Sequence, residues 1–334
     1  MIDLHLHLDG SLTPEDILSL AEIAQIPLPC DDRDSLRPLL QVDPDCRNLG
    51  EYLEKFDLPL QVLQTEQTIS LSVYYLIKRL AADRLVYGEI RFAPQLHQAG
   101  GLSQQQVVAA AVAGLEKGVR EFGIPAQLIL CCMRDGNNQQ ANMETVRAAK
   151  EFLGKGVCAL DLAGNEAAFP TKDFAEIFQI ARDSNVPFII HAGEAAGAES
   201  VWQALDLGAK RIGHGIRAIE DAALVAALRE KKTPLEMCFT SNLQTKAANS
   251  PERYPLCAFL QQGLSVTVNT DNMTVSGTDL RREYRLLKEA FGLTEEVLQE
   301  IACNAADAAF LPKEQKTQLK KQIAEKFSTW LSTT

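Results

Sequence analysis

The sequence has few histidines and lacks the cysteine spacing of a redox or zinc motif. Its 334 residues include five histidines and eight cysteines, and no two cysteines form a CxxC motif. Scattered cysteines without such spacing are typical of reduced thiols in a cytosolic protein. The N-terminus lacks a basic stretch followed by an apolar segment, and no apolar run approaches the ~18 residues that span a bilayer. We therefore expect a cytoplasmic protein with no membrane partner.

Positive charge is also scarce. The chain carries 33 Lys and Arg against 44 Asp and Glu, for a formal net charge of −11, and it contains no basic run. This balance argues against nucleic acid as a partner and leaves a small molecule as the expected ligand. No repeat, low-complexity tract or linker divides the sequence, so we expect a single domain over residues 1–334. The oligomeric state cannot be deduced from these features.

The first ten residues, MIDLHLHLDG, place two histidines two positions apart in an apolar segment that ends at a glycine. Alternate side chains of a strand share a face, so His5 and His7 can reach one metal ion together. Taken alone, this pattern could equally be a strand with two histidines by chance. The positions of the remaining histidines decide between these interpretations.

Apolar segments bounded by Gly, Pro or Asp recur along the chain and alternate with helical patterns. We predict eight strands, at residues 2–8, 86–93, 126–133, 157–162, 187–191, 211–214, 234–239 and 264–269. The strands are continuously apolar, as expected for a parallel sheet that is covered on both faces. Eight such units in one domain predict a (β/α)8 TIM barrel, an α/β fold.

Two regions exceed the minimal barrel. Helical patterns at 14–24, 48–60 and 66–84 predict a helical insertion after strand 1, covering part of the barrel mouth. Further patterns at 281–290, 295–305 and 313–331 predict extra C-terminal helices.

Active sites of such barrels are built at the C-terminal ends of the strands. The predicted strands carry ionisable or polar side chains at or just beyond these ends: His5, His7, Asp9, His191, Glu194, His214, Asp271 and Asn272. The alternative is that the histidines are satisfied core residues. We favour a site, because cores seldom bury unpaired ionisable groups.

A metal centre follows from these side chains. His5, His7, His191 and Asp271 would supply three imidazoles and a carboxylate, leaving one position for water. This donor set favours zinc, although iron or cobalt could also be held. A second metal usually needs a bridging ligand such as a carboxylated lysine, and the segment LDLAG that ends strand 4 has no lysine. We therefore expect one Zn²⁺ per chain.

Glu194 and His214 remain for proton transfer. A carboxyl group that burial keeps neutral can act as an acid, and an imidazole can accept or direct the proton of a metal-bound water. The alternative role for each is to orient a metal ligand.

At these residues the chain resembles the adenosine deaminase family. The matching segments, in the family's order, are HLHLDGS (5–11), YGEIRFAPQLH (87–97), DLAGNE (161–166), HAGE (191–194), RIGHG (211–215), TSN (240–242) and NTDN (269–272). The combination is specific, whereas HxH alone occurs in many metallohydrolases. The resemblance implies hydrolytic deamination of adenosine, and of 2′-deoxyadenosine, by a zinc-activated water in purine salvage.

The resemblance also implies roles for individual residues. His5, His7, His191 and Asp271 would bind zinc, Glu194 would protonate purine N1, and His214 would orient or deprotonate the activated water. Asp9 would hold ribose hydroxyls and the Gly164 N–H would face N3. Tyr52, Leu53 and Phe56, in a segment (51–56) similar to the family's lid helix, would close over the ribose.

Two positions depart from the commoner family pattern. Asn272 stands where many members have Asp, at the position that contacts N7, and an Asn amide can donate to this acceptor directly. Asn165 replaces the Asp that is common in DLAGDE, and we have no physical interpretation of this change.

Three alternative functions stay open. The first is deamination of another purine, namely adenine or an N6-substituted or modified adenosine; Asp9 favours a nucleoside, because related adenine deaminases tend to have Glu there. A phosphorylated substrate is disfavoured because no Arg or Lys cluster is evident beside the strand-end motifs. The second is a metal-dependent phosphoester hydrolase, which usually needs more histidines. The third is an inactive binding protein, against which the intact set of site residues argues.

Overall fold

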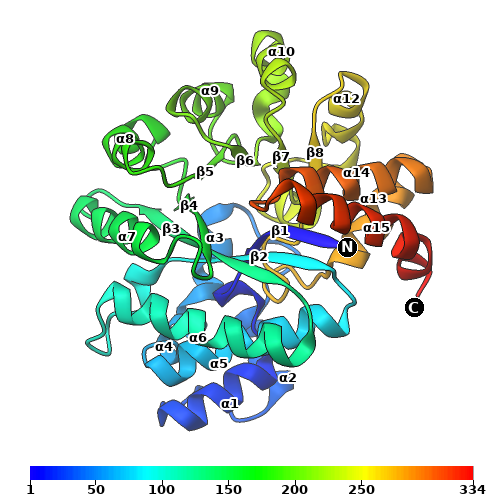
Figure 1. Ribbon diagram of the computed structural model, residues 1–334. Helices are drawn as coiled ribbons and strands as arrows, with labels where there is room; N and C mark the ends of the chain where they lie inside the picture. Colours follow the sequence, from blue (N-terminus) through cyan, green and yellow to red (C-terminus); the bar gives the residue numbers. More distant parts are fainter. Residues whose placement is uncertain (334) are drawn as a thin grey trace.

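In the computed structural model, which describes residues 1–333, the eight predicted strands are all present and parallel (Figure 1). They are β1 (Ile2–His7), β2 (Tyr87–Phe92), β3 (Ala126–Arg134), β4 (Val157–Gly164), β5 (Ile189–Ala192), β6 (Arg211–His214), β7 (Leu235–Met237) and β8 (Val266–Val268). Each predicted strand coincides with an observed one to within a few residues at its ends. The α/β barrel prediction is therefore confirmed.

The barrel closes at two seams. Strands β1 to β4 pair in chain order, and β5 to β8 do the same. At one seam the Leu160 N–H donates to the Pro187 carbonyl at 2.9 Å. At the other, the backbone N–H of His7 donates to the Asp271 carbonyl and that of Asp271 to the His5 carbonyl, each at 2.8 Å. The second seam places Asp271 beside the HxH motif.

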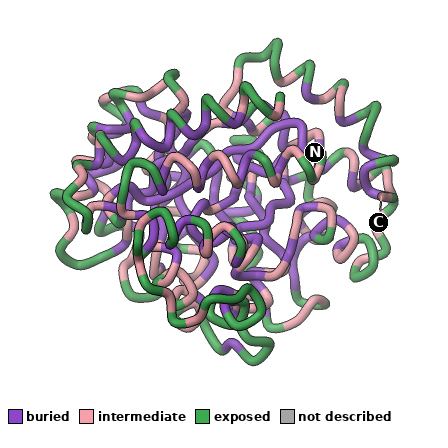
Figure 2. The backbone as a smooth tube through the Cα atoms, turned by 90° about the horizontal axis from the view of Figure 1, so that it is seen from below, coloured by how far each residue is buried: buried purple, intermediate pink, exposed green. Residues whose placement is uncertain are grey.

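Helices surround the barrel and bury one face against it. The outer helices after β2 to β7 are α6 (Gln104–Phe122), α7 (Gln139–Phe152), α8 (Ala175–Asp183), α9 (Ala198–Leu207), α10 (Ala222–Lys231), α11 (Phe239–Gln244) and α12 (Leu256–Gln261). Short 3-10 turns accompany them: η3 (Pro94–His97), η4 (Thr171–Phe174), η5 (Ile216–Glu220) and η6 (Pro251–Arg253). Ser103 and Gln106 form a capping box that begins α6. Figure 2 shows the buried backbone in the interior and the exposed backbone on the outer turns.

The segment between β1 and β2 is helical along most of its length. It comprises η1 (Asp9–Ser11), α1 (Pro14–Ala24), α2 (Arg33–Leu40), α3 (Leu49–Leu53), η2 (Glu54–Phe56), α4 (Asp57–Val62) and α5 (Glu66–Ala82). The helix predicted at 48–60 is divided, with the 3-10 turn η2 between α3 and α4. Helix α2 was not predicted, because it is short and contains Pro38. We call the segment from α3 to α4, residues 49–62, the lid.

Three helices follow β8: α13 (Leu280–Phe291), α14 (Glu295–Ala308) and α15 (Lys313–Ser332). Helix α14 lies against β8 and β1, and α15 covers α13 and α14 (Figure 1). The end of α14 is tied to the barrel by a hydrogen bond from the Arg211 guanidinium to the Ala308 carbonyl at 2.9 Å. Among residues 1–333, the helices are all too short or too polar to cross a membrane.

Candidate active site

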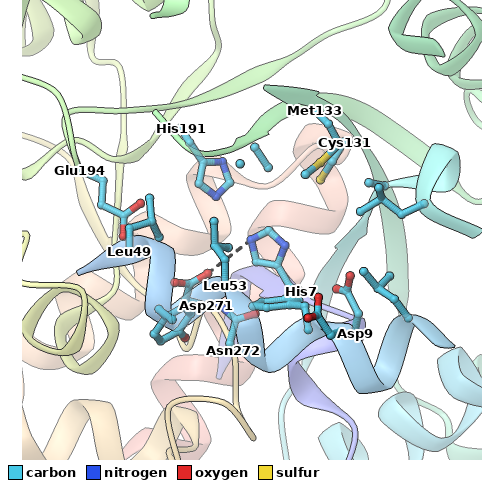
Figure 3. A pocket seen from close by; sticks show the side chains of 18 of the residues that line it. His7, Asp9, Leu49, Leu53, Cys131, Met133, His191, Glu194, Asp271 and Asn272 are labelled. Carbon is cyan, nitrogen blue, oxygen red and sulfur yellow. Dashed lines mark ion pairs between the residues drawn. The ribbon is translucent and has the colours of Figure 1, made fainter. Parts of the chain in front are cut away.

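Four predicted metal ligands converge at the C-terminal ends of the strands. His5 and His7 on β1, His191 on β5 and Asp271 just after β8 each offer one ligand atom, and these atoms lie within 4.8 Å of one another. Asp271 Oδ1 is 3.4 Å from His5 Nε2 and 3.3 Å from His7 Nε2. Figure 3 shows His7, His191 and Asp271 pointing toward one another. Three imidazoles and a carboxylate at this spacing fit one transition metal.

Two of the imidazole ligands, His5 and His191, are held on their far side by a carboxylate. His5 Nδ1 lies 2.8 Å from Glu236 Oε2, and His191 Nδ1 lies 2.9 Å from Asp161 Oδ2. With Nδ1 facing a carboxylate, the Nε2 lone pair of each ring is left for a metal. His5 Nε2 is buried and has no hydrogen-bond partner within the described part of the chain. The donor set and this unsatisfied nitrogen both fit a metal site.

A single buried arginine joins these two carboxylates. The Arg91 guanidinium donates to Asp161 Oδ2 at 2.7 Å and to Glu236 Oε2 at 2.9 Å. Burial alone would raise the pKa of Asp161, but the neighbouring His191 and Arg91 hold it well below its usual value. Burial would also raise the pKa of Glu236, but Arg91 and Arg211 hold it below its usual value. Both carboxylates therefore stay ionised and can hold the Nδ1 protons of the histidines.

Glu194 follows β5 and is almost fully enclosed. Its Oε2 lies 3.6 Å from His214 Nε2, and its Oε1 accepts a hydrogen bond from the Thr245 hydroxyl at 3.3 Å. Burial raises the pKa of Glu194 to about 8, and the negative charges of Asp271 and Glu166 add to this effect. The carboxyl group is therefore held in its protonated form near neutral pH.

His214, at the end of β6, is equally buried. Burial, reinforced by the nearby His5, lowers its pKa well below the ordinary value, so the imidazole is neutral. Its Nδ1 lies 2.9 Å from the Asn242 side-chain nitrogen. The Tyr254 hydroxyl donates to Asn242 Oδ1 at 3.4 Å, which matches this orientation of the amide.

Two of these residues have left-handed backbone conformations that non-glycine residues seldom adopt. His214 has φ of 60° and Asp271 has φ of 61°. Such conformations cost free energy and concentrate at functional sites. Here they turn the two side chains inward as their strands end.

The site opens into a cavity of about 190 Å³, which is lined by every residue predicted to bind substrate. These are Asp9, Tyr52, Leu53, Phe56, Gly164 and Asn272. Tyr52, Leu53 and Phe56 belong to the lid, and the Tyr52 hydroxyl lies 2.7 Å from the Ser276 hydroxyl. Figure 3 shows Leu49 and Leu53 of the lid beside the polar side chains of His7, Glu194 and Asp271.

Asp9 and Asn272, in the wall of the cavity, each have one buried oxygen without a partner among the residues that the structure describes. Asp9 Oδ1 and Asn272 Oδ1 have no hydrogen-bond partner among residues 1–333. Burial raises the pKa of Asp9 to about 6. A Cβ atom at Gly10 would lie 1.9 Å from Asn272 Oδ1, so only glycine leaves room for the Asn272 side chain. The Asn272 oxygen thus lies against Gly10, and the unsatisfied Asp9 oxygen marks a position where a polar ligand can bind.

Sequence reasoning missed part of the cavity wall and the residues that orient the ligands. The missed wall is mainly apolar and includes Leu49, Leu60, Ala93, Leu96, Cys131, Met133 and Ala163. Met133 could have been found, because it ends the predicted third strand. Ser241 and Asn242, quoted only as part of a motif, bind Asp271 and His214; the Ser241 hydroxyl donates to Asp271 Oδ2 at 2.6 Å.

The sequence has no cluster of Arg or Lys beside the strand-end motifs, but the fold brings three cationic residues to a neighbouring cavity. Arg47, Arg217 and Lys246 line a second cavity of about 420 Å³ that shares Leu49 and Glu194 with the first. These residues come from separate parts of the chain, so the cluster is invisible in the sequence. Arg47 is paired with Glu51, and Arg217 donates to the Glu194 carbonyl at 3.2 Å.

Comparison with known proteins assigns the chain to a family. The family model described as adenosine deaminase matches residues 1–326. An adenosine deaminase of Haemophilus ducreyi is 50% identical over 331 residues, covering 98% of this chain and 96% of that protein. The structure of an adenine deaminase from Arthrobacter aurescens superposes with a TM-score of 0.89 at 28% identity, covering 98% of both chains. An amidohydrolase from Burkhoderia ambifaria with bound Zn has the same fold, with a TM-score of 0.86 at 21% identity, covering 98% of this chain and 90% of the other. The chain belongs to the adenosine deaminase family.

Proposed function

We propose that this protein is a hydrolase that converts adenosine and 2′-deoxyadenosine to the corresponding inosines and ammonia, acting as a single catalytic domain over residues 1–334. The observation that carries the proposal is one cavity in which a protonated carboxyl group, Glu194, faces the ligand group His7, His191 and Asp271. The 50% identity to an adenosine deaminase supports the same substrate.

We propose that His5, His7, His191 and Asp271 hold one zinc ion per chain. Support comes from their convergence, from the unsatisfied His5 Nε2 and from the carboxylates behind two of the rings. When bound, such an ion lowers the pKa of a coordinated water towards ~7 and so makes a nucleophile available at neutral pH. Iron or cobalt would satisfy the same donors.

Glu194 supplies the proton that the ring needs. Attack of water at C6 makes that carbon tetrahedral and moves ring electrons onto N1, which must then be protonated. Burial holds a proton on Glu194 at neutral pH, and this proton passes to N1. The two protons of the water complete the reaction. One passes to the exocyclic amine, which leaves as ammonia while C6 becomes a carbonyl, and the other restores the proton on Glu194. Without an acid at this position, negative charge would build up on N1 in a mainly apolar cavity.

His214 orients the attacking water. The Asn242 amide N–H donates to Nδ1, so the neutral imidazole carries its proton on Nε2, which faces the cavity and Glu194. In this tautomer Nε2–H is a donor, so His214 orients the water's oxygen in the ground state. The structure therefore supports the orienting role over the deprotonating one.

The other lining residues account for recognition of a purine nucleoside. The unsatisfied Asp9 Oδ1 can accept hydrogen bonds from ribose hydroxyls. The backbone N–H of Gly164 faces N3 and the amide of Asn272 donates to N7. Tyr52, Leu53 and Phe56 of the lid cover the ribose and exclude water.

Free adenine is the second candidate substrate, because a structural neighbour at 28% identity is an adenine deaminase. Adenine has no ribose and would leave Asp9 buried and unsatisfied. AMP must also be tested, because Arg217 and Lys246 line the adjoining cavity.

A spectrophotometric assay of adenosine, 2′-deoxyadenosine, adenine and AMP side by side tests the proposal. We expect both nucleosides to be preferred over adenine by at least ~10²-fold in kcat/KM, because a site built for hydroxyls rejects a ligand that lacks them. Asp9→Ala should lower activity on adenosine and narrow this preference. Preferred turnover of adenine or of AMP would reject the nucleoside assignment.

A further inference from the structure

One buried carboxylate beside the site has no role in the reaction proposed above. Glu166 lies in the loop after β4, two residues beyond Gly164, and is only 2% exposed. Its oxygens accept five hydrogen bonds, all from the segment that follows β5. Oε1 accepts from the backbone of Gly193 at 2.7 Å and from the Ser200 hydroxyl at 2.6 Å. Oε2 accepts from the backbone of Glu194, Ala195 and Ala196 at 3.0, 2.7 and 3.0 Å.

Four consecutive backbone N–H groups that converge on one anion form a nest. These groups belong to a turn in which Gly193 has φ of 73°, where a Cβ atom would come within 2.6 Å of Val201. The helix that follows, α9, begins at Ala198, and its N-cap residue Gly197 provides no side-chain cap. The Glu166 carboxylate therefore satisfies donors that the turn cannot satisfy by itself. Without it, two buried and two part-buried N–H groups would lose their partner.

The Glu194 side chain has little else to fix its position. Its carboxyl group makes one hydrogen bond, at 3.3 Å to Thr245, and lies 3.6 Å from His214. The position of its carboxyl group therefore depends on its backbone. That backbone is the part of the chain that Glu166 holds, through the Glu194 N–H and its neighbours on both sides.

Glu166 also connects the loop after β4 to the loop after β5, and the strands before these loops share little backbone pairing. Strands β4 and β5 belong to different halves of the barrel and share one isolated bridge, between Leu160 and Phe188, within the described residues. Arg134 adds a hydrogen bond to the His191 carbonyl at 2.7 Å, but it does not reach Glu194. At the C-terminal ends of these two strands, Glu166 supplies the hydrogen bonds to the N–H groups of the turn around Glu194. Arg217, after β6, donates to the carbonyls of Gly193 and Glu194 at 3.1 and 3.2 Å.

We propose that Glu166 is a positioning residue for the deamination, holding the proton donor Glu194 at a fixed distance from the Gly164 backbone. This inference rests on the proposed function, in which Glu194 serves N1 and Gly164 serves N3. N1 and N3 belong to one rigid six-membered ring, so the two contacts must keep a constant spacing. The purine contacts come from two strands, and Glu166 couples them.

The test is Glu166→Gln, which keeps the shape but replaces an acceptor oxygen with an NH2 group facing N–H donors. We expect kcat for adenosine to fall by about 10²-fold, the scale for ~1 Å misplacement of a catalytic group, with KM changed by less than about 3-fold. The bound metal should be unchanged, because His191 is held separately by Asp161. Glu166→Asp, which keeps the charge, should recover part of kcat. Glu199→Gln, an exposed carboxylate at the start of α9, is the matched control and should behave as the parent.

Hydrogen exchange gives a readout that does not depend on activity. Amides 193–196 should exchange faster in Glu166→Gln than in the parent, while the amides of β5 and β6 stay protected. If Glu166→Gln does not fold, Ser200→Ala is the second variant, because it removes one of the five hydrogen bonds to Glu166. In Ser200→Ala, amides 193–196 should also exchange faster than in the parent, and kcat should fall less than in Glu166→Gln. Full kcat in a folded variant, or unchanged exchange at 193–196, would overturn the inference. A parent protein that leaves adenosine unchanged would reject the proposed function instead, and the exchange result would still stand.

Discussion

Asn242 donates its side-chain N–H to Nδ1 of His214 across 2.9 Å, and both residues are buried. Tyr254 donates to the oxygen of the same amide, so the amide orientation and the imidazole tautomer are linked. The neutral ring then has its remaining proton on Nε2, on the side of the cavity. One amide thus determines whether His214 acts as a donor or as a base.

Asn242→Asp should move the proton of the neutral His214 ring from Nε2 to Nδ1. A carboxylate raises the pKa of a neighbouring imidazole by about 1 to 3 units and accepts a proton from Nδ1. Because the reaction uses neutral His214, the acidic limb of kcat/KM should move to higher pH by at least about one unit. Tyr254→Phe leaves the amide in place and should move the limb little. An acidic limb at the parental pH in Asn242→Asp would show that this contact does not control His214.

The barrel and most of the site could be predicted because their signals are local. Each strand is a continuous apolar segment, and the strand-end rule brought His5, His191 and Asp271 together from positions far apart in the sequence. The backbone hydrogen bonds between β1 and Asp271 then place the Asp271 carboxylate beside His5 and His7. The lid residues Tyr52 and Phe56 came from the family resemblance alone, because nothing in their local pattern indicates a cavity.

What could not be predicted depends on tertiary contacts. Arg91 was read as part of a strand motif, yet it joins the carboxylates behind two metal ligands. Arg47, Arg217 and Lys246 gather only in the folded chain. The nest around Glu166 requires four backbone N–H groups to converge, and no residue type encodes that convergence.

The purified protein should contain about one transition metal per chain. Chelation should abolish activity and lower Tm, because a ligand that binds only the folded state stabilises it. Zinc or cobalt should restore both, and magnesium should not, because it disfavours imidazole ligands. Elemental analysis with thermal melts measures these quantities. Two tightly bound metals in the active form would indicate a binuclear hydrolase.

Glu194→Gln should keep the fold and the metal but lower kcat by roughly 10²- to 10⁴-fold, the range for a positioned general acid. In the parent, burial first and the charge of Asp271 second raise the pKa of Glu194 to about 8. The acid must be protonated, so kcat should fall as pH rises through the pKa of Glu194. The positive charge of a bound metal ion lowers this pKa, so the fall should be centred at or below pH 8. The variant should lack this alkaline limb. Near-parental kcat in Glu194→Gln would remove Glu194 from the mechanism.

Asn272 is the residue at which this chain departs from the commoner family pattern, and its proposed contact with N7 can be tested with a single-atom change in the substrate. The analogue 7-deazaadenosine has C–H in place of N7 and would leave the Asn272 amide unpaired in the cavity. The expected cost is about 1 to 3 kcal/mol, or roughly 5- to 150-fold in kcat/KM. Asn272→Ala removes the donor, so that variant should have the same kcat/KM for adenosine and 7-deazaadenosine. Comparing both enzymes with both substrates forms a double-mutant cycle that isolates the contact between Asn272 and N7. If the parent enzyme already turns over both substrates with equal kcat/KM, Asn272 does not contact N7. Its function would then be to support the backbone of Asp271, which precedes it in the chain.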